Sequence, residues 1–480
     1  MTAPPKLPAK LPSRFLDDIK AAVGPHGWAT DEATLAPHLA EERGTYRGAC
    51  AILAMPASTD EVARVVKLCA DASVAVTPQG GNTGLAGGAV PASGVLLSLK
   101  RMRRIRALDA LNFTMVAEAG CVLADVQRAA DEAGALFPLS LAAEGSCTVG
   151  GNISTNAGGV HVLRYGNTRD LVLGIEAVLP DGRVWNGLRS LHKDNTGYDL
   201  KQLFIGAEGT LGVVTAATLK LFPKLKARAV AFAALASPAA ALDLFVRLRE
   251  RGGETLIAFE FANRFALDCV LRHAPGTRDP FVTPHPWYAL AELASPHAKG
   301  DTLAAVLEAV LAEATEAETV ADATIAQSEA QAAALWQLRE SISEAQKPEG
   351  GSLKHDVSVP VARVPDLVTR GADVAERLIP GVRVCAFGHM GDGNVHFNLS
   401  QPVGTDRAAF FAERERVNRG VHDLVRELNG SFSAEHGVGQ LRLADMARYK
   451  SSVELDLMRA IKAALDPKGI MNPGKVLPPR

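Results

Sequence analysis

The sequence predicts an α+β protein with more than one domain, and three observations support this prediction. The chain has 480 residues, which is more than a single hydrophobic core usually supports. Before Pro223, runs with the apolar spacing of helices alternate with short strand-like runs. After Pro223 the chain changes to alanine-rich helical stretches separated by strands, and glycine becomes sparse until residue 381. We therefore expect a domain boundary near residue 224.

The part of the chain before this boundary is expected to alternate helices and strands. Residues 60–72 carry apolar side chains at helical spacing, and the following VAVTPQGG has the pattern of a strand that enters a glycine-rich turn. Residues 114–120 have the pattern of a strand, followed by the helix-like VLADVQRAADEAG. A hairpin is expected within 171–185, because Asp181-Gly182 is a strong turn signal.

The composition argues against several classes of protein. Apolar residues make up 47% and charged residues 22% of the chain, which is ordinary for a globular protein and argues against long disorder. The net charge of -2 gives no global attraction to phosphate backbones, so nucleic acid is not an expected partner. The most apolar stretch, 229–246, is broken by Ser237, Pro238 and Asp243, so we expect no membrane span.

The cysteines and the N-terminal residues bear on location. Six scattered cysteines without a CxxC pair are interpreted as reduced, mostly buried thiols. They also lack iron–sulfur spacing, so an electron relay beyond a bound cofactor would lie in another protein. Lys6, Lys10 and Arg14 are followed by Asp17 and Asp18, with no apolar segment of a secretory signal. The early acidic residues also argue against a mitochondrial presequence, so we expect a cytoplasmic protein.

Two glycine-rich segments are candidates for binding an anion. In PQGGNTGLAGG (78–88), five glycines follow an apolar strand, so backbone N–H groups can converge on a group such as a pyrophosphate. A flexible turn is the alternative for this cluster alone. The second segment, 142–159, mixes glycines with small hydrogen-bonding residues around the apolar Val149 and Ile153, which is more than a linker needs. Neither GxGxxG nor GxxxxGK[ST] occurs in these segments, so a Rossmann site and a P-loop lack support.

A histidine-bearing hairpin is expected in GVRVCAFGHMGDGNVHFNLS (381–400). If Asp392 and Gly393 are its two turn residues, His389 faces His396 across the strands, with Cβ atoms roughly 5 Å apart. This geometry suits two ligands of one cation. A hairpin with two half-exposed histidines remains the alternative for this segment alone.

The segment SAEHGVGQ (433–440) favours the metal interpretation. It contains Glu435 and His436 in a loop whose glycines can bring side chains close to a ligand. Two histidines and one carboxylate leave coordination positions open, as in catalytic metal sites. Because no thiolate is present, Zn²⁺ is favoured, and Mn²⁺ or Fe²⁺ stays open. Asn398 comes two residues after His396 and is therefore expected on the same face of the sheet.

Two further segments carry candidate substrate-binding residues. Residues 336–346 (WQLRESISEAQ) have the pattern of a helix, which places Arg339 and Ser343 on one face. Residues 353–361 alternate like a strand that projects Lys354 to one side. Without a family context, ordinary surface charge is the stronger interpretation of both cations.

Four motifs in this order resemble the vanillyl-alcohol oxidase and p-cresol methylhydroxylase (PCMH) superfamily of flavoproteins. PQGGNTGL is similar to its pyrophosphate loop, and EGSCTVGGNISTNAGG is similar to its second FAD-contacting segment. GAEGTLGVVT (206–215) is similar to its closing strand signature. NPGK (472–475) is similar to the segment by which such chains return to the flavin.

The resemblance implies a PCMH-type FAD-binding domain over 1–223 and an α+β substrate- and metal-binding cap domain over 224–430. A C-terminal segment, 431–480, would complete the active site and the FAD domain. Non-covalent FAD is expected, because Asn82 stands where some members carry a flavin-linked histidine. The residues that match FAD-contacting positions are Pro78, Gly80, Gly81, Asn82, Thr83, Gly84, Leu85, Gly145, Ser146, Thr148, Gly151, Asn152, Asn156, Ala157, Gly158, Gly209 and Asn472.

Within this superfamily the chain is most similar to the FAD-dependent D-2-hydroxyacid dehydrogenases. By that resemblance His389, His396 and Glu435 match the metal ligands, and His436 matches the general base. The substrate-binding positions are matched by Arg339, Ser343, Lys354 and Asn398. Ser343 stands where threonine is common, which keeps the hydroxyl.

The resemblance implies oxidation of a small D-2-hydroxy acid by hydride transfer to flavin N5. Electrons would pass to a separate acceptor such as an electron-transfer flavoprotein or a quinone, and a homodimer is one possible assembly. Arg339 and Lys354 offer two cations besides the metal, which favours a dicarboxylate, D-2-hydroxyglutarate, over D-lactate. The alternatives are a D-lactate or glycolate dehydrogenase, a metal-dependent hydrolase, and a non-catalytic flavin-binding protein.

Overall fold

The protein, in this computed structural model, divides into two compact units. The described residues are 11, 13–297 and 300–479. Unit 1 consists of residues 1–159, 166–224 and 435–480, and unit 2 consists of residues 160–165 and 225–434. Lys6 and Lys10 of the basic N-terminal segment lie outside the described residues.

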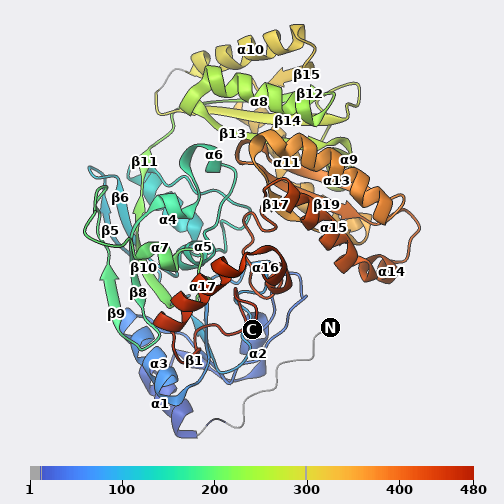
Figure 1. Ribbon diagram of the computed structural model, residues 1–480. Coiled ribbons are helices and arrows are strands. Elements are labelled where there is room, and N and C mark those ends of the chain that lie inside the picture. The colour runs from blue at the N-terminus through green and yellow to red at the C-terminus, as the bar shows by residue number, and fades with distance from the viewer. Residues whose placement is uncertain (1–10, 12, 298–299, 480) are drawn as a thin grey trace. The chain divides into compact units, whose positions relative to one another are not determined.

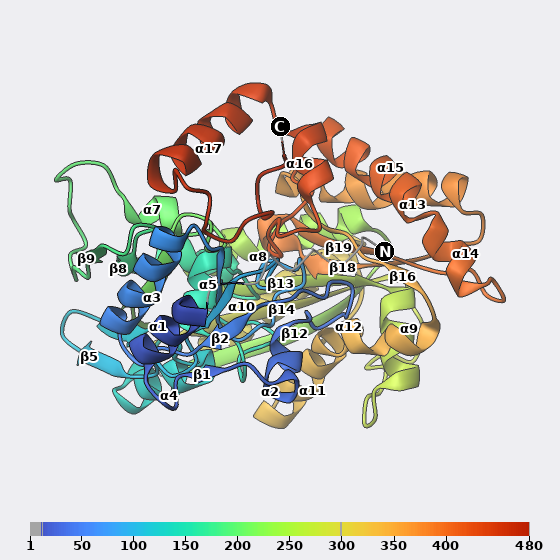
Figure 2. The same ribbon diagram turned by 90° about the horizontal axis from the view of Figure 1, so that it is seen from below.

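The first sheet of unit 1 has four strands in the order β1-β2-β4-β3, and β2, β4 and β3 are parallel neighbours. The bounds of these strands and of the two helices beside them are β1 Trp28–Ala29, β2 Ile52–Ala54, β3 Val76–Gln79, β4 Val95–Ser98, α1 Ser13–Val23 and α3 Thr59–Ala72. The two helices lie side by side (Figures 1 and 2), and α3 buries Val62 and Val66 in the core that they share. The helix predicted for 60–72 is confirmed, and Ser58 caps it by accepting the backbone N–H of Glu61.

The second sheet of unit 1 is antiparallel, with five strands in the order β5-β6-β10-β8-β9. These strands are β5 Ile105–Asp109, β6 Thr114–Glu118, β8 Val172–Val178, β9 Val184–Gly187 and β10 Val213–Lys220. The strand and the hairpin predicted for 114–120 and 171–185 are confirmed. At the turn, Gly182 has φ +88° and Leu179 donates its backbone N–H to the carbonyl oxygen of Arg183 at 2.8 Å.

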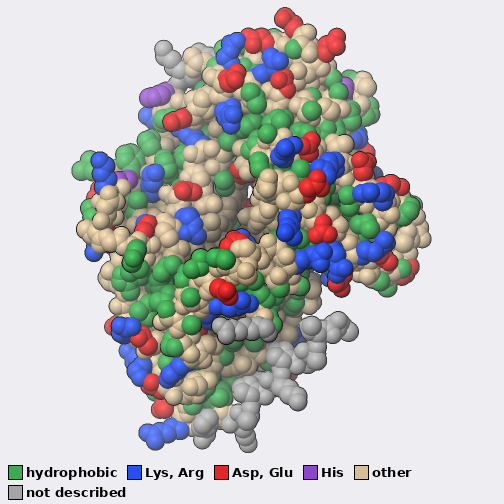
Figure 3. All heavy atoms as spheres, viewed as in Figure 1, with side chains coloured by type: hydrophobic (Ala, Val, Ile, Leu, Met, Phe, Trp, Pro, Cys, Tyr) green, Lys and Arg blue, Asp and Glu red, His purple; other side chains and the backbone are tan. Residues whose placement is uncertain are grey.

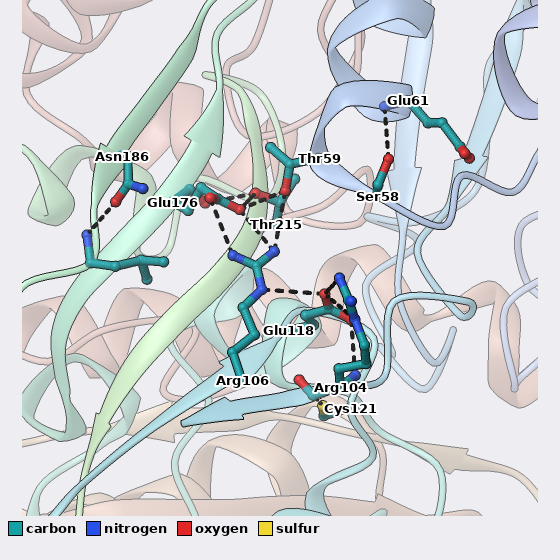
Figure 4. A network of polar contacts seen from close by, with 11 residues as sticks. Ser58, Thr59, Glu61, Arg104, Arg106, Glu118, Cys121, Glu176, Asn186 and Thr215 are labelled. Carbon is teal, nitrogen blue, oxygen red and sulfur yellow. Dashed lines mark hydrogen bonds and ion pairs between the residues drawn. The ribbon is translucent and has the colours of Figure 1, made fainter. Parts of the chain in front are cut away.

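A buried ion network joins this sheet to helix α3 (Figure 4). Arg106 of β5 donates to Glu118 of β6 at 3.2 Å and to Glu176 of β8 at 3.1 Å. Thr59, at the start of α3, donates its hydroxyl to Glu176 at 2.6 Å. The side chains of Glu118 and Glu176 are only 1% and 8% exposed. Arg106 therefore bridges two carboxylates that have little access to water, and Arg104 adds a second positive charge at Glu118.

The C-terminal part of unit 1 returns to the first sheet. Its helices are α16 Leu443–Tyr449 and α17 Ser452–Leu465. Beyond α17 the chain pairs with β3, where Val76 donates to the Ile470 carbonyl oxygen and accepts from the Asn472 N–H. Helix α17 leaves Val453 and Leu457 66% and 61% exposed, and Figure 3 shows hydrophobic side chains at the surface where Figure 1 places this helix.

The other elements of unit 1 are short, apart from helix α4. They are α2 Glu32–Leu35, η1 Ala36–His38, α4 Leu123–Glu132, β7 Ala135–Leu136, α5 Val149–Thr155, η2 Thr168–Leu171, α7 Lys201–Phe204 and β11 Phe222–Pro223. Helix α4 confirms the helix predicted after the strand at 114–120.

Unit 2 is built on an eight-stranded antiparallel sheet. Its strands follow the order β15-β12-β14-β13-β18-β19-β16, and β17 also pairs with β19. Their bounds are β12 Ala227–Leu235, β13 Leu256–Asn263, β14 Trp287–Ser295, β15 Val320–Ile325, β16 Ser352–Leu353, β17 Asp356–Ser358, β18 Arg383–His389 and β19 Asn394–Ser400.

Helices cover both faces of this sheet, which explains why its strands are apolar on both sides. On β12, Ala231 and Ala233 belong to a core with α8, α10, α13 and α15, whereas Val230 and Phe232 belong to a core with α9, α11 and α12. The helices of unit 2 are α6 Val162–Tyr165, α8 Pro238–Gly252, α9 Arg264–His273, α10 Gly300–Glu316, α11 Glu329–Glu340, α12 Ile342–Ala345, α13 Val364–Leu378, α14 Arg407–Ala412 and α15 Arg414–Glu427, with short 3₁₀ turns η3 Gly253–Thr255, η4 Lys347–Glu349, η5 Val361–Arg363 and η6 Met390–Asp392.

The helix predicted over 336–346 is broken in two. Helix α11 ends at Glu340 and α12 begins at Ile342, with Ser341 between them as the cap of both. Arg339 and Ser343 therefore lie on different helices, and the prediction that they share one helical face is wrong. The apolar spacing continues across the break, so sequence periodicity alone does not reveal it.

Candidate active site

The two glycine-rich segments of unit 1 pack against each other, backbone to backbone. A Cβ atom on Gly80 would lie 2.3 Å from Thr148 Oγ1, and one on Gly81 would lie 2.2 Å from the carbonyl oxygen of Ser146. In contrast, a Cβ on Gly84 would have no heavy atom within 4 Å. The loops are thus in tight contact at one end, while the backbone of the first loop is open further along. This is the kind of cradle that an extended phosphate-bearing cofactor requires.

Polar side chains hold the two loops in shape. Asn82 adopts φ +60° and donates its side-chain amide to the carbonyl oxygen of Ala40 at 2.8 Å. Thr148 caps helix α5 by accepting the N–H of Gly151 at 3.4 Å. Asn156 ends this helix in the left-handed conformation. Several small polar residues of these segments therefore set the backbone geometry of the loops.

The C-terminal NPGK segment closes on the first loop. Asn472 donates its side-chain amide to the carbonyl oxygens of Gly88, at 2.9 Å, and of Glu208, at 2.7 Å. Its Oδ1 atom is buried and has no hydrogen-bond partner among the described residues, so it is an acceptor that a bound group can use. A Cβ on Gly209 would lie 3.1 Å from Pro78 Cγ. Segments far apart in sequence are thereby brought to one place, and their donors and acceptors fit FAD.

Glu208 is a buried residue of this site that our sequence interpretation missed. Its carboxylate accepts the backbone N–H groups of Val438, at 2.7 Å, and Gly439, at 2.9 Å. Burial raises the pKa of Glu208, against the effect of these two donors and of the Lys475 charge, and burial lowers the pKa of Lys475 to about 8. Gly437 makes room for this carboxylate, since a Cβ there would lie 2.8 Å from Glu208 Oε1. A glutamate between glycines in GAEGTLG was the available signal.

In unit 2, the histidine hairpin forms with a register different from the predicted one. His389 pairs with Asn394, and His396 pairs with Phe387, so the prediction that the two histidines face each other directly is wrong. The turn is longer than two residues because Met390, which is fully buried, begins a 3₁₀ turn. Gly393 then completes this turn in the left-handed conformation.

The two histidines are nevertheless close neighbours on one face of the sheet. His396 lies two residues beyond Asn394, the cross-strand partner of His389, so both imidazoles project to the same side. Their ring centroids are 5.5 Å apart, and each offers a nitrogen ligand atom within 4.8 Å of the other's. This pair can contribute two ligands to one cation. Asp356 of β17 pairs with His396 and places a carboxylate oxygen 3.9 Å from its Nδ1 atom.

A second buried carboxylate, Glu260, connects His389 with Arg339. Its Oε1 atom lies 2.8 Å from His389 Nδ1, and its Oε2 atom accepts from Arg339 Nε at 2.7 Å. Burial alone would raise the pKa of Glu260, but the charges and hydrogen bonds of these two partners outweigh burial and lower it. The sequence interpretation did not identify this residue, although it is the one acidic residue in the apolar strand LIAFEFAN.

The other predicted substrate residues have different surroundings. Asn398 is buried and donates its side-chain amide to Gln346 Oε1 at 3.2 Å. Lys354 lies between β16 and β17 and is half-buried, whereas Ser343 on α12 is exposed. Of these residues, Asn398 and Lys354 belong to the strand region that carries the histidines.

Glu435 and His436 are the first residues of the C-terminal part of unit 1. The Glu435 carboxylate and the His436 Nε2 atom are 3.7 Å apart, and each side chain is about a quarter exposed. Because the two hairpin histidines belong to unit 2, the three-ligand metal site and the role of His436 stay predictions.

Two protein-family models match this chain. The model described as FAD binding domain matches residues 50–187, and the model described as FAD linked oxidases, C-terminal domain, matches residues 224–476, more than half of the chain. The chain belongs to the FAD-linked oxidase family. The predicted FAD cofactor is thereby confirmed.

Relatives of this FAD-linked oxidase define its enzyme class further. The chain is 38% identical over 471 residues to an Arabidopsis thaliana protein named D-2-hydroxyglutarate dehydrogenase, mitochondrial, and the match covers 98% of this chain and 82% of the relative. It is 42% identical over 469 residues to a Bos taurus protein of the same name, covering 96% and 84% of the two chains. This FAD-linked oxidase is therefore an FAD-dependent hydroxyacid dehydrogenase, as its motifs indicated.

A solved structure supports the PCMH-type fold. The structure of p-cresol methylhydroxylase with substrate bound matches this FAD-linked oxidase with a TM-score of 0.75 at 17% identity, over 96% of each chain. At this identity the likeness concerns the fold alone, and it confirms the predicted fold class.

The comparison also corrects the predicted location. The Arabidopsis thaliana and Bos taurus relatives are both named as mitochondrial proteins, so the prediction of a cytoplasmic protein is wrong. The early acidic residues were too weak a signal for this conclusion. The interpretation of the cysteines holds, since all six are free and five are buried. Among the described residues, no helix combines the length and apolar character that a membrane span requires.

Proposed function

We propose that this FAD-linked oxidase oxidises D-2-hydroxyglutarate to 2-oxoglutarate and passes the electrons to a separate acceptor. The names of the relatives suggest the substrate. The observation that carries the proposal is the polar face of the unit 2 sheet, where His389 and His396 lie side by side and Glu260 links His389 to Arg339. This arrangement suits a substrate that has both a chelating hydroxy acid group and a carboxylate.

For the metal, we assign a divalent cation, Zn²⁺ before Mn²⁺ or Fe²⁺, to His389, His396 and Glu435. The imidazole nitrogens are close enough to share one ion. Glu435 directly follows Ala434, whose backbone N–H donates to the carbonyl oxygen of Asp356 at 3.2 Å. Imidazole and carboxylate ligands without thiolate suit zinc in a catalytic site. When bound, the ion would make the hydroxyl of a chelated substrate more acidic.

For the cofactor, we propose non-covalent FAD in the glycine cradle of unit 1. Asn82 stands where some superfamily members carry the linking histidine, and its amide is engaged with the Ala40 carbonyl oxygen. Asn472 offers the buried Oδ1 acceptor to the bound cofactor. When bound, FAD supplies the hydride acceptor of the reaction.

For the proton, we assign His436 as the general base. A neutral imidazole can take the hydroxyl proton as the hydride leaves Cα.

For the substrate, we assign Arg339, Ser343, Lys354 and Asn398. Arg339 uses only its Nε atom on Glu260 and makes no other hydrogen bond to the described residues, so both Nη atoms are available for a carboxylate. Lys354 supplies the second cation. The electron acceptor is assigned to another molecule, an electron-transfer flavoprotein or a quinone, because the cysteine spacing provides no iron–sulfur relay.

The test is anaerobic flavin bleaching with purified protein and a panel of D- and L-2-hydroxy acids. We expect D-2-hydroxyglutarate to reduce the flavin faster than D-lactate or glycolate, and the L-enantiomer to leave it oxidised. Faster reduction by D-lactate or glycolate would favour the alternative substrates. A flavin that stays yellow with every acid would contradict the enzymatic function.

A further inference from the structure

Glu260 has a fixed place in the unit 2 sheet. It lies on β13 between β14 and β18, and in the backbone register it pairs directly with His389. The side chains of a directly paired position project to the same face of a sheet. Sheet register therefore places this carboxylate against His389, and the side chain of Glu260 is only 2% exposed.

Each oxygen of Glu260 serves a different partner. Oε1 lies 2.8 Å from His389 Nδ1, and Oε2 lies 2.7 Å from Arg339 Nε. A buried carboxylate is costly unless it is paired and hydrogen-bonded, and here both partners stabilise its charged form. One buried group thus contacts both a proposed metal ligand and a proposed substrate-binding residue.

The contact with His389 determines which ring nitrogen can serve as a metal ligand. Because the carboxylate can only accept, the His389 Nδ1 atom carries the proton and donates it to the hydrogen bond. In neutral His389, Nε2 then carries the lone pair that a metal ion would use, and the ring has a fixed direction. A carboxylate partner of this kind orients metal-binding histidines and makes them more basic.

The contact with Arg339 determines the orientation of its guanidinium group. Nε is held by Glu260, and the guanidinium lies over the ring of Phe387 at 5.0 Å. Two contacts on different parts of the group fix its plane and leave the Nη edge free for a carboxylate. Phe387 is also the cross-strand partner of His396, at 4.9 Å between ring centroids.

We propose that Glu260 is a positioning residue that aligns the metal site with the site for a substrate carboxylate. It holds His389 with Nε2 directed to the metal, and it holds Arg339 with its Nη edge directed to the substrate. The inference rests on the proposed function, because it needs a metal at His389. It goes further by predicting that the Glu260 side chain controls both the affinity for the metal and the affinity for the substrate carboxylate.

Glu260→Gln tests the role, and Glu292→Gln is a matched control. Glu292 lies on the neighbouring strand β14 and is also buried, but it contacts Trp336 and Arg228. The measurement is zinc affinity of the chelator-treated protein, by competition with a chromophoric chelator, followed by the Kd of 2-oxoglutarate from the flavin spectrum. We expect Glu260→Gln to weaken zinc binding by about 10- to 100-fold and to weaken the binding of 2-oxoglutarate as well.

Arg339→Met separates the two effects. It should weaken 2-oxoglutarate binding but leave zinc affinity within about twofold, whereas Glu292→Gln should change neither. If Glu260→Gln does not fold, Glu260→Asp keeps the charge on a side chain that is one methylene shorter, and it should still lower both affinities.

The outcomes distinguish this inference from the proposed function. If wild-type protein binds zinc and Glu260→Gln binds it equally well, the positioning role is refuted while the metal site stands. If wild-type protein binds no zinc, the metal assignment and this inference both fail. A loss of both affinities in Glu292→Gln would show that any buried carboxylate of this sheet has the same effect, and would also overturn the inference.

Discussion

Replacing Arg106 with Met should destabilise unit 1 through the network shown in Figure 4. Arg106 is the only arginine that contacts Glu176 among the described residues, and its loss leaves this carboxylate with the hydroxyls of Thr59 and Thr215. Glu118, in contrast, retains its ion pair with Arg104. Breaking a buried ion pair typically costs about 3–5 kcal/mol. Because the Arg106 side chain is 26% exposed, we expect a smaller loss, about 2–4 kcal/mol.

Arg104→Met is the matched control. Arg104 contacts Glu118 at 2.9 Å, but its side chain is 74% exposed, and Glu118 keeps Arg106 after the substitution. We expect a loss of about 1 kcal/mol or less. The release of flavin on heating, followed by its fluorescence at a fixed FAD concentration, should show Arg106→Met melting roughly 5–15 °C below the wild type, and Arg104→Met only slightly below it.

The pH dependence of this loss has a definite sign. Burial raises the pKa values of Glu118 and Glu176, but the arginine contacts and other hydrogen bonds outweigh it and lower both values below the ordinary 4.5. The resulting stabilisation is fully present above about pH 4.5 and is lost as the pH falls through the lowered values. The deficit of Arg106→Met should therefore shrink toward pH 4. Equal melting of the two variants, or a deficit that does not change with pH, would refute the reasoning.

Four further predictions concern the site. Acid precipitation should leave the yellow flavin in the supernatant, because Asn82 provides no covalent link; flavin retained on the pellet would contradict this. Chelator treatment should abolish turnover while FAD stays bound, with recovery on added zinc or manganese; full activity of verified metal-free protein would refute it. His436→Ala should slow anaerobic flavin reduction by about 10²–10⁴-fold with zinc content unchanged, and an unchanged rate would require another base. Lys354→Met should reduce kcat/KM for D-2-hydroxyglutarate by a factor that is at least about tenfold larger than for D-lactate, a difference of about 1.4 kcal/mol in activation free energy. Equal losses for the two substrates would show that Lys354 does not bind the second carboxylate of D-2-hydroxyglutarate.

Features set by local sequence were predictable. The helix at 60–72 and the strand at 114–120 follow from apolar spacing, and the two glycine loops follow from composition together with a preceding strand. The hairpin was predicted, but its register was not. Asp392-Gly393 is a strong two-residue turn signal, whereas the buried Met390 selects a longer turn in the structure. Tertiary packing therefore overrode the local turn preference.

The two buried carboxylates were beyond the reach of local reasoning. Glu260 is 79 residues from Arg339 and 129 residues from His389 along the chain, and Glu208 is 230 residues from Val438. No periodicity or spacing rule connects positions so far apart. Their only local signal is an acidic residue in an apolar or glycine-rich context, which shows that a partner is needed but does not identify it.

Glu260 also changes the argument for a dicarboxylate substrate. The sequence suggested two cations besides the metal, Arg339 and Lys354, where the metal and one cation would suffice for a monocarboxylate. In the structure, Arg339 already has an anionic partner, so its charge alone no longer demands a second carboxylate on the substrate. Its Nη edge still recognises a carboxylate by geometry. Comparing Lys354→Met with Arg339→Met therefore shows which of the two cations separates D-2-hydroxyglutarate from D-lactate.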